Sequence, residues 1–219
     1  MNTTKAYKGL PMEGIIASWY AKTTLKDHKR HKGMAQQMSG KIPANGRVLE
    51  IAPGPGYFCI ELARLGNYQV AGLDISKSFV EIARRNAAEA GLKIDFQQGN
   101  ASRMPFEENT FDFTFCQAAF KNFSEPVSAI AEMHRVLRPG GISVIVDLRR
   151  DAPAAEIERE IQGMRLGRVN EFMVRWTFRN MLLKSAYSVD EIRTMVAQTP
   201  FRSCRIDLDG IGFQAWLEK

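Results

Sequence analysis

The sequence predicts an α/β fold in which a mostly parallel β-sheet lies between layers of helices. Short apolar runs that favour strands alternate with segments whose apolar residues recur at helical spacing. The run 142–146 is almost continuously apolar, as expected of a strand that helices cover on both faces. Residues 205–209 and 212–217 are joined through Gly-Ile-Gly, which predicts a C-terminal antiparallel hairpin.

The remaining elements follow in a regular order. A short helix is expected from about residue 12 and a second around residues 34–38, both before the first strand. Further helices are expected between successive strands. Ser188 and Glu191 fit a capping box that opens the last helix before the hairpin. The expected parallel strands are 48–51, 69–73, 94–98, 111–116 and 142–146.

Length and composition fit one domain. A chain of 219 residues can bury a sizeable core, and 45% hydrophobic with 25% charged residues is ordinary for a globular protein. We expect four parts, namely an N-terminal helical arm, a cofactor-binding core, a helical lid insertion, and a closing helix with the hairpin. Their expected bounds are 1–45, 46–150, 151–188 and 189–219.

The sequence predicts a cytoplasmic protein without a membrane partner. No early segment has the apolar stretch of a signal peptide, and no run approaches the roughly 18 apolar residues of a membrane span. Cys59, Cys116 and Cys204 are widely spaced, which favours reduced thiols over disulfides or a metal site. The net charge of +6 permits an anionic partner without requiring one.

The turn after the first strand favours a ligand that carries no phosphate. Glu50 lies near the end of that strand, and the turn 52–56 reads Ala-Pro-Gly-Pro-Gly before a helix begins. A strand, a tight turn and a helix place a ligand crevice at the carboxyl end of the strand. A pyrophosphate needs backbone N–H donors at the helix N-terminus, and the two prolines have none. S-adenosylmethionine (SAM) is such a phosphate-free ligand.

Two motifs resemble those of the class I SAM-dependent methyltransferases. Residues 50–56 are similar to the family's motif I, (D/E)-x-G-x-G-x-G, with Ala52 where the family normally has glycine. Residues 132–141 closely resemble the family's E-x-x-R-V-L-K-P-G-G, which is the more specific match. The resemblance covers residues 46–150 by motif and the hairpin by architecture. It implies a Rossmann-like three-layer sandwich with a seven-stranded sheet, SAM as the cofactor and S-adenosylhomocysteine as the product.

The strand tips supply the expected cofactor-binding residues. Asp74 stands 24 positions after Glu50 (74 − 50), about the separation at which a carboxylate meets the ribose hydroxyls. Alternatively, Asp74 caps the next helix, a role that Ser76 could also fill. In the family an acidic residue at position 100 meets the adenine amino group, and the amide oxygen of Asn100 can accept the same bond. The full expected set is Glu50, Ala52, Gly54, Gly56, Asp74, Ile75, Asn100, Ala101 and Gln117.

The acceptor site is expected from the arm, the tip of the fourth strand and the lid. Ile15, Ile16, Trp19 and Tyr20 fall on one helical face, which either caps the crevice or packs as an ordinary helix. Phe120 lies where the acceptor approaches in the family, but it could equally pack against the next helix. Aromatic and basic side chains in the lid suit an aromatic or anionic small molecule. The expected substrate-binding residues are Trp19, Phe120, Arg149 and Trp176.

We expect methyl transfer to O, N or C of a small metabolite by in-line displacement. The sulfonium already makes the methyl group electrophilic, so alignment and desolvation supply much of the acceleration and no metal is expected. If the nucleophile must lose a proton, Tyr20, His28 and His31 are the candidate bases, although the histidines also fit a solvated basic turn. The chain lacks the N/D-P-P-Y/F and Pro-Cys motifs of nucleic-acid methyltransferases, so nucleic acid is not the expected partner. An RNA or protein methyltransferase and a non-catalytic SAM-binding protein are the alternatives.

Overall fold

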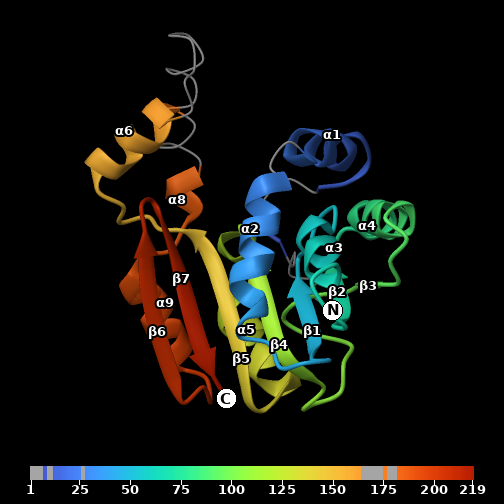
Figure 1. The fold of residues 1–219 in the computed structure, drawn as a ribbon. Helices are drawn as coiled ribbons and strands as arrows, with labels where there is room; N and C mark the ends of the chain where they lie inside the picture. Colours follow the sequence, from blue (N-terminus) through green and yellow to red (C-terminus); the bar gives the residue numbers. More distant parts are fainter. Residues whose placement is uncertain (1–6, 9–11, 26–27, 164–174, 177–181) are drawn as a thin grey trace, which may run out of the picture.

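The computed structural model describes residues 7–8, 12–25, 28–163, 175–176 and 182–219. They contain a seven-stranded sheet in the order β3-β2-β1-β4-β5-β7-β6. Strands β1 to β5 are parallel neighbours, whereas β7 runs antiparallel to both β5 and β6. The predicted α/β class, with its mostly parallel sheet and terminal hairpin, is therefore confirmed (Figure 1). The strands are β1 Arg47–Ile51, β2 Gln69–Asp74, β3 Asp95–Gln98, β4 Phe111–Gln117, β5 Leu137–Leu148, β6 Ser203–Asp209 and β7 Gly212–Glu218.

Helices cover both faces of the sheet. Alternate residues of β1 point to opposite sides, so Val48 joins the core beneath α2, α3 and α4, whereas Leu49 and Ile51 join the core beneath α5 and α9. The three layers are visible in Figure 1. The helices are α1 Gly14–Thr24, α2 His28–Ser39, α3 Tyr57–Ala63, α4 Lys77–Glu89, α5 Pro126–Val136, α6 Ala154–Gly163, α8 Leu183–Ser185 and α9 Val189–Ala197, with a 3₁₀ turn at Phe120–Asn122.

Local sequence signals explain where several elements begin. The Ser188 hydroxyl accepts a hydrogen bond from the Glu191 N–H, and the Glu191 carboxylate accepts one from the Ser188 N–H. This confirms the capping box at the start of α9. β5 begins earlier than the expected 142–146 because Leu137 already pairs with Phe111, across an irregularity in register. The middle of the expected lid, 164–174 and 177–181, lies outside the described residues.

The apolar face expected on the first helix of the arm, either as a cap over the crevice or as an ordinary packing face, is not the face that packs on α4. Two small residues, Ala17 and Ala21, are buried against Phe79 and Ile82 of α4. The large apolar side chains are at the surface instead, with Ile15 89% and Trp19 64% exposed. Alanines allow α1 to approach α4 closely, and the bulky residues are left outside. Within the described chain, no helix is long and apolar enough to cross a membrane.

Candidate cofactor and acceptor site

The turn between β1 and α3 combines two glycines with different surroundings. Gly54 has a φ of +55°, and a Cβ atom built there would meet nothing within 4 Å. Gly56 has a φ of +79°, but a Cβ atom there would come within 2.8 Å of the Phe96 ring. Gly56 therefore allows α3 to pack on β3, whereas Gly54 leaves open space at the carboxyl end of β1. Open space at this point is what an approaching ligand needs.

Ala52 occupies the left-handed region, with a φ of +56°, at the position where the motif normally has glycine. An L-residue there is strained by about 1–2 kcal/mol. We expect Ala52→Gly to raise the free energy of unfolding by about 0.5 kcal/mol, after the added chain entropy of glycine is subtracted. Ala88→Gly on the exposed face of α4 is the matched control, and it should lower stability by about 0.5–1 kcal/mol. Stability is measured by urea titration. An equal loss of stability in both variants would contradict the strain at Ala52.

Asp74 lies at the end of β2 with its carboxylate directed at the glycine turn. Its Oδ2 accepts a hydrogen bond from the Gly54 N–H at 3.0 Å, and its Oδ1 accepts one from the Ser76 N–H at 2.9 Å. The N-cap of α4 is Ser76, whose hydroxyl accepts from the Phe79 N–H. The capping role is thus filled by Ser76. Each carboxylate oxygen keeps a further lone pair, so the ribose role of Asp74 stays open as a prediction.

Glu50 is fully enclosed at the end of β1. Its Oε2 accepts hydrogen bonds from the Cys59 N–H at 3.2 Å and from the Cys59 thiol at 2.9 Å. Burial raises the pKa of Glu50 to about 7, and the negative charge of Asp74 adds to this. Burial likewise raises the pKa of Asp74 to about 6, although the N–H groups of Ser76 and Gly54 oppose the shift. Neither carboxylate has a basic partner among the described residues, so a cation entering the crevice would relieve both.

This charge pattern predicts that SAM affinity rises with pH. Both carboxyl groups have a higher pKa in the folded protein than in the unfolded chain. Protonation of these groups therefore stabilises the ligand-free folded protein fully in acid, and this stabilisation is lost as the pH rises through about 6 and 7. A cationic ligand prefers the ionised carboxylates, so protons must leave when it binds at low pH. We expect at least about tenfold tighter SAM binding at pH 8 than at pH 5.5 by calorimetry. Glu50→Gln should flatten the curve, and equal wild-type affinity at both pH values would contradict the prediction.

The expected adenine side lies between β2 and β3. Ile75 is 40% exposed just beyond Asp74, where a flat ring could cover it. The Asn100 Oδ1 accepts a hydrogen bond from the Ser102 N–H at 2.9 Å, and Ala101 is half-buried against the core. Gln117 is half-buried at the end of β4. The structure therefore brings all nine expected SAM-binding residues to one edge of the sheet, and their contacts with the cofactor stay predictions.

A buried ion pair holds the segment that follows β4. The Lys121 Nζ lies 2.8 Å from the Asp147 Oδ1 at the end of β5, and it also donates to the Ala118 carbonyl. The Asp147 Oδ2 accepts from the Lys121 N–H. Sequence reasoning missed this pair, although Asp147 has the signal that identified Asp74, an acidic residue at the tip of an apolar strand. The pair fixes the turn that carries Phe120.

Aromatic rings gather beside this turn. Phe120 is fully buried, with its ring centroid 5.6 Å from Phe123 and 5.7 Å from Tyr187. Tyr7 of the arm pairs with Phe123 through an isolated β-bridge. Burial raises the pKa of Tyr7, and the nearby Tyr20 and Asp74 raise it further. Tyr7 therefore lies beside Phe123 and close enough to Asp74 to be affected by its charge, and no sequence pattern had indicated it.

The arm also forms hydrogen bonds with the start of α4. The Glu13 carboxylate accepts hydrogen bonds from the N–H groups of Lys77 and Ser78, both at 3.0 Å. Slight burial opposes ionisation of Glu13, but the hydrogen bonds from Ser78, Ser76 and Lys77 outweigh it and lower its pKa. A carboxylate at a helix N-terminus also interacts favourably with the helix dipole. These contacts anchor the arm over the crevice edge.

The candidate bases lie along the helical layer on one side of the crevice. The His28 Nε2 is 3.1 Å from Glu61 of α3, and the His31 ring is 5.6 Å from the Tyr57 ring, the first residue after the glycine turn. Tyr20 packs edge-on against Phe79 of α4. His31 thus lies beside a residue adjacent to the turn, and the roles of all three in proton transfer stay predictions.

The four expected substrate-binding residues are not gathered at one point. Phe120 is a packed core side chain, and the Arg149 guanidinium donates to the carbonyls of Gly210 and Asp151. Trp19 and Trp176 are both more than half exposed, on α1 and beyond α6. Phe120 and Arg149 thus hold the segments that follow β4 and β5 in place. Contact of any of the four with an acceptor stays a prediction.

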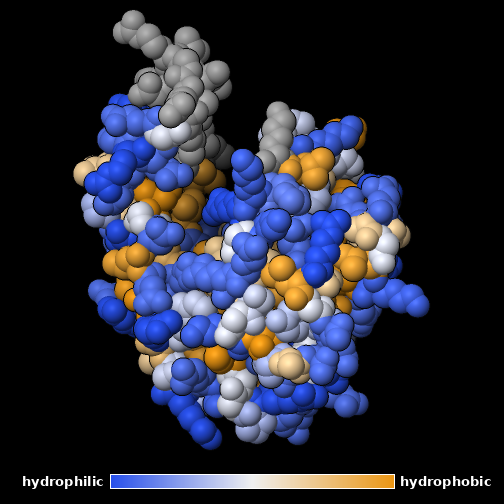
Figure 2. Space-filling model, in the orientation of Figure 1, coloured by the Kyte–Doolittle hydropathy of each residue, from blue (hydrophilic) through white to orange (hydrophobic). Residues whose placement is uncertain are grey.

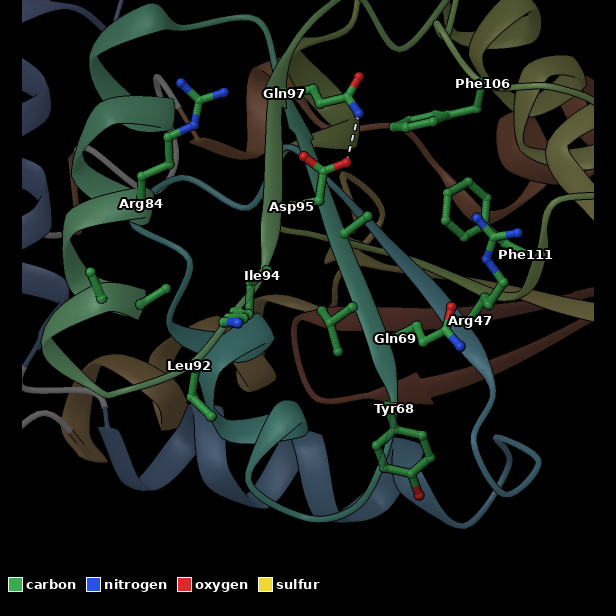
Figure 3. A pocket seen from close by; sticks show the side chains of 15 residues that line it. Arg47, Tyr68, Gln69, Arg84, Leu92, Ile94, Asp95, Gln97, Phe106 and Phe111 are labelled. Atoms are coloured by element: carbon green, nitrogen blue, oxygen red, sulfur yellow. Dashed lines mark hydrogen bonds between the residues drawn. The ribbon is translucent and has the colours of Figure 1, made fainter.

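A second hollow lies away from this edge. An open groove of about 770 Å³ runs along the amino ends of β1 and β2 and across β3, because residues 99–110 form turns rather than a helix over the sheet (Figure 3). Figure 3 shows Asp95 joined to Gln97 near the middle and Arg47 beside Phe111 at one side. The Arg84 guanidinium is already bound to the Phe96 carbonyl. The groove contains none of the expected SAM-binding residues.

Comparison with known proteins matches the central part of the chain to one family model. A family model described as a methyltransferase domain matches residues 49–145, which include the glycine turn, Asp74 and the tip of β4. These residues are similar to the methyltransferase-domain family, in line with the two motifs that resemble class I SAM-dependent methyltransferases. The resemblance to methyltransferases predicted from the two motifs is confirmed, and that resemblance implies SAM as the cofactor.

Curated relatives of this methyltransferase domain share a name. The demethylmenaquinone methyltransferase of Deinococcus radiodurans is 38% identical over 46% of this chain and 42% of that protein. The one of Bacillus licheniformis is 30% identical over 65% of this chain and 59% of that protein. The chain therefore spans about half the length of the curated relatives it matches.

Solved structures share the fold of the methyltransferase domain. A putative SAM-dependent methyltransferase from Methanococcus maripaludis aligns with 100% of this chain and 96% of its own, at a TM-score of 0.76 and 22% identity. The [4+2]-cyclase SpnF aligns with 86% of this chain and 80% of its own, at a TM-score of 0.57 and 21% identity. At these identities the likeness concerns the fold alone.

Proposed function

We propose that this protein is a SAM-dependent methyltransferase that methylates a ring carbon of a small aromatic molecule of the quinol type. The observation that carries the proposal is the pair of buried carboxylates, Glu50 and Asp74, on either side of an open, proline-containing glycine turn. That arrangement suits a cationic nucleoside without phosphate. A dinucleotide would instead need N–H donors that Pro53 and Pro55 lack.

The residues present fit SAM part by part. Asp74 has lone pairs for the ribose hydroxyls, and Ile75 and Asn100 lie where adenine would extend from the ribose. Gly54 leaves room for the amino-acid tail, and the charge of Glu50 favours its ammonium group. The bound cofactor supplies an electrophilic methyl group, which passes to the acceptor carbon as its bond to sulfur breaks.

The acceptor side is aromatic. The buried rings of Phe120 and Phe123 pack with Tyr187 near the tip of β4, and Tyr7 bridges to Phe123, so Tyr7 and Tyr187 are the partly exposed rings that an acceptor could reach. Aromatic rings bind a planar acceptor through stacked or edge contacts and exclude water from it. The names of the curated relatives support a quinone-type acceptor.

The free thiols of Cys59, Cys116 and Cys204 support a cytoplasmic location.

The protein's own contribution is alignment, exclusion of water and proton removal. The Lys121–Asp147 pair fixes the turn that faces the acceptor, and the arm covers the edge through Tyr7 and Glu13. A hydroxylated ring becomes a carbon nucleophile when its O–H loses a proton, and a ring proton leaves after methylation. Tyr20, His28 and His31 remain the proposed bases for these protons.

The test is transfer of label from methyl-labelled SAM to a short-chain demethylmenaquinol. We expect the label on a ring carbon of the extracted quinol, and loss of the signal in Gly54→Val. SAM binding without label in the quinol or any other small aromatic acceptor would contradict the proposal in favour of a non-catalytic SAM-binding protein. Label found only in added RNA or protein would favour the macromolecular alternative.

A further inference from the structure

The outer face of α1 carries large apolar side chains at the surface of the protein. Ile15 is 89% exposed, Trp19 64% and Ile16 46%, and Leu25, which directly follows the helix, is 55% exposed. The inner face is already occupied, because the two buried alanines of α1 pack on α4. Figure 2 shows apolar atoms over α1 surrounded by hydrophilic ones. Contiguous exposed apolar side chains of this size mark a contact surface rather than a core helix.

The same tip of the molecule is basic. The charged residues of α1 and α2 are all basic and exposed, namely Lys22, Lys29, Arg30 and Lys32. The two residues that join the helices, Lys26 and Asp27, cancel each other in charge. Exposed apolar side chains on a short helix beside a cluster of basic residues suit a segment that lies in the headgroup region of a membrane.

We infer that α1 and the start of α2 dock on an anionic lipid surface. Phospholipid headgroups attract the four cations, while Ile15, Trp19 and Leu25 enter the boundary between headgroups and acyl chains. A nucleic acid would use the cations but leave the isoleucines and Leu25 without contacts. A protein surface carries charges of both signs, which fits a tip without acidic helix residues less well. This interaction differs from the sequence expectation of no membrane partner, which rested on the lack of a spanning segment.

The position of α1 relates the docking surface to the cofactor site. The residues just before α1 are anchored at the start of α4 through Ser76 and Ser78, next to Asp74, so α1 lies at the carboxyl edge of the sheet (Figure 1). A protein resting on α1 would therefore turn its crevice edge towards the lipid. This second step rests on the proposed function, since it supplies an acceptor that carries a lipid tail. The docking itself does not depend on methyl transfer.

The test is sedimentation of the protein with vesicles, without SAM or acceptor. Vesicles of phosphatidylcholine with about one third phosphatidylglycerol should bind the protein at low salt, and vesicles of phosphatidylcholine alone should bind it at least about tenfold less. The double variant Ile15→Ser/Trp19→Ser should bind at least about tenfold more weakly. Leu208→Ser is the matched control, because Leu208 is an exposed apolar residue on β6, and it should bind as the wild type does.

Three results would overturn the docking. They are wild-type protein that does not sediment with either vesicle, equal binding of the Ile15→Ser/Trp19→Ser variant and the wild type, and binding to polyuridylate in place of vesicles. Because no cofactor is present, any of these leaves the methyl-transfer proposal standing. Conversely, vesicle binding by a protein that transfers no methyl group would support the docking and not the proposed function.

Discussion

Gly54→Val is expected to abolish detectable SAM binding while the protein still folds. A Cβ atom at position 54 would meet no protein atom within 4 Å, so the valine side chain would occupy the space left for the ligand. The positive φ of this residue adds a strain of about 1–2 kcal/mol, which lowers stability without preventing folding. Calorimetry with SAM and a urea titration on the same sample measure both effects.

Gly140→Val is the control for Gly54→Val. Gly140 also has a positive φ, +79°, and also has nothing within 4 Å of a Cβ atom, but it lies in the irregular first part of β5, at the amino end of the sheet. It should lose comparable stability and keep wild-type SAM affinity. If Gly54→Val bound SAM as the wild type does, the glycine turn would not be part of the cofactor site.

Asp74→Ala is expected to weaken SAM binding by about 1–3 kcal/mol, because two ribose hydroxyls lose their acceptor in a buried site. The variant also loses the hydrogen bonds that the Gly54 and Ser76 N–H groups donate to this carboxylate, so thermal unfolding must be followed alongside calorimetry. A loss of affinity in a variant that remains folded at the assay temperature supports the ribose assignment.

Asp112→Ala separates the ribose role from a general role in holding main chain. The Asp112 carboxylate accepts a hydrogen bond from the Arg47 N–H and pairs with Arg138, but it lies at the amino end of β4. This variant should lose stability and keep its SAM affinity. An unchanged dissociation constant in Asp74→Ala, or an equal loss in both variants, would show that Asp74 does not hold the ribose.

The sheet could be predicted from the sequence because each strand carries its own apolar run between turn residues. The strand tips followed from the same pattern, so Glu50, Asp74 and Gln117 were placed at the correct edge. The glycine turn was predicted too, including Ala52 as the departure that the structure shows to be strained.

The contacts between distant segments could not be predicted. The bridge from Tyr7 to Phe123 and the hydrogen bonds from Ser78 and Lys77 to Glu13 join residues far apart in the chain, and neither leaves a periodic signal. The face through which α1 packs could not be predicted for a similar reason. Its large apolar side chains left open a packing face or a cap over the crevice, whereas close approach to α4 selected the small residues Ala17 and Ala21 for packing.

The most direct test of the central claim is a crystal structure of the protein soaked with SAM. We expect density for the nucleoside over the turn 52–56, with its ribose hydroxyls within hydrogen-bond distance of the Asp74 carboxylate. Density in the groove at the amino ends of β1 and β2, or an empty carboxyl edge at saturating SAM, would contradict it.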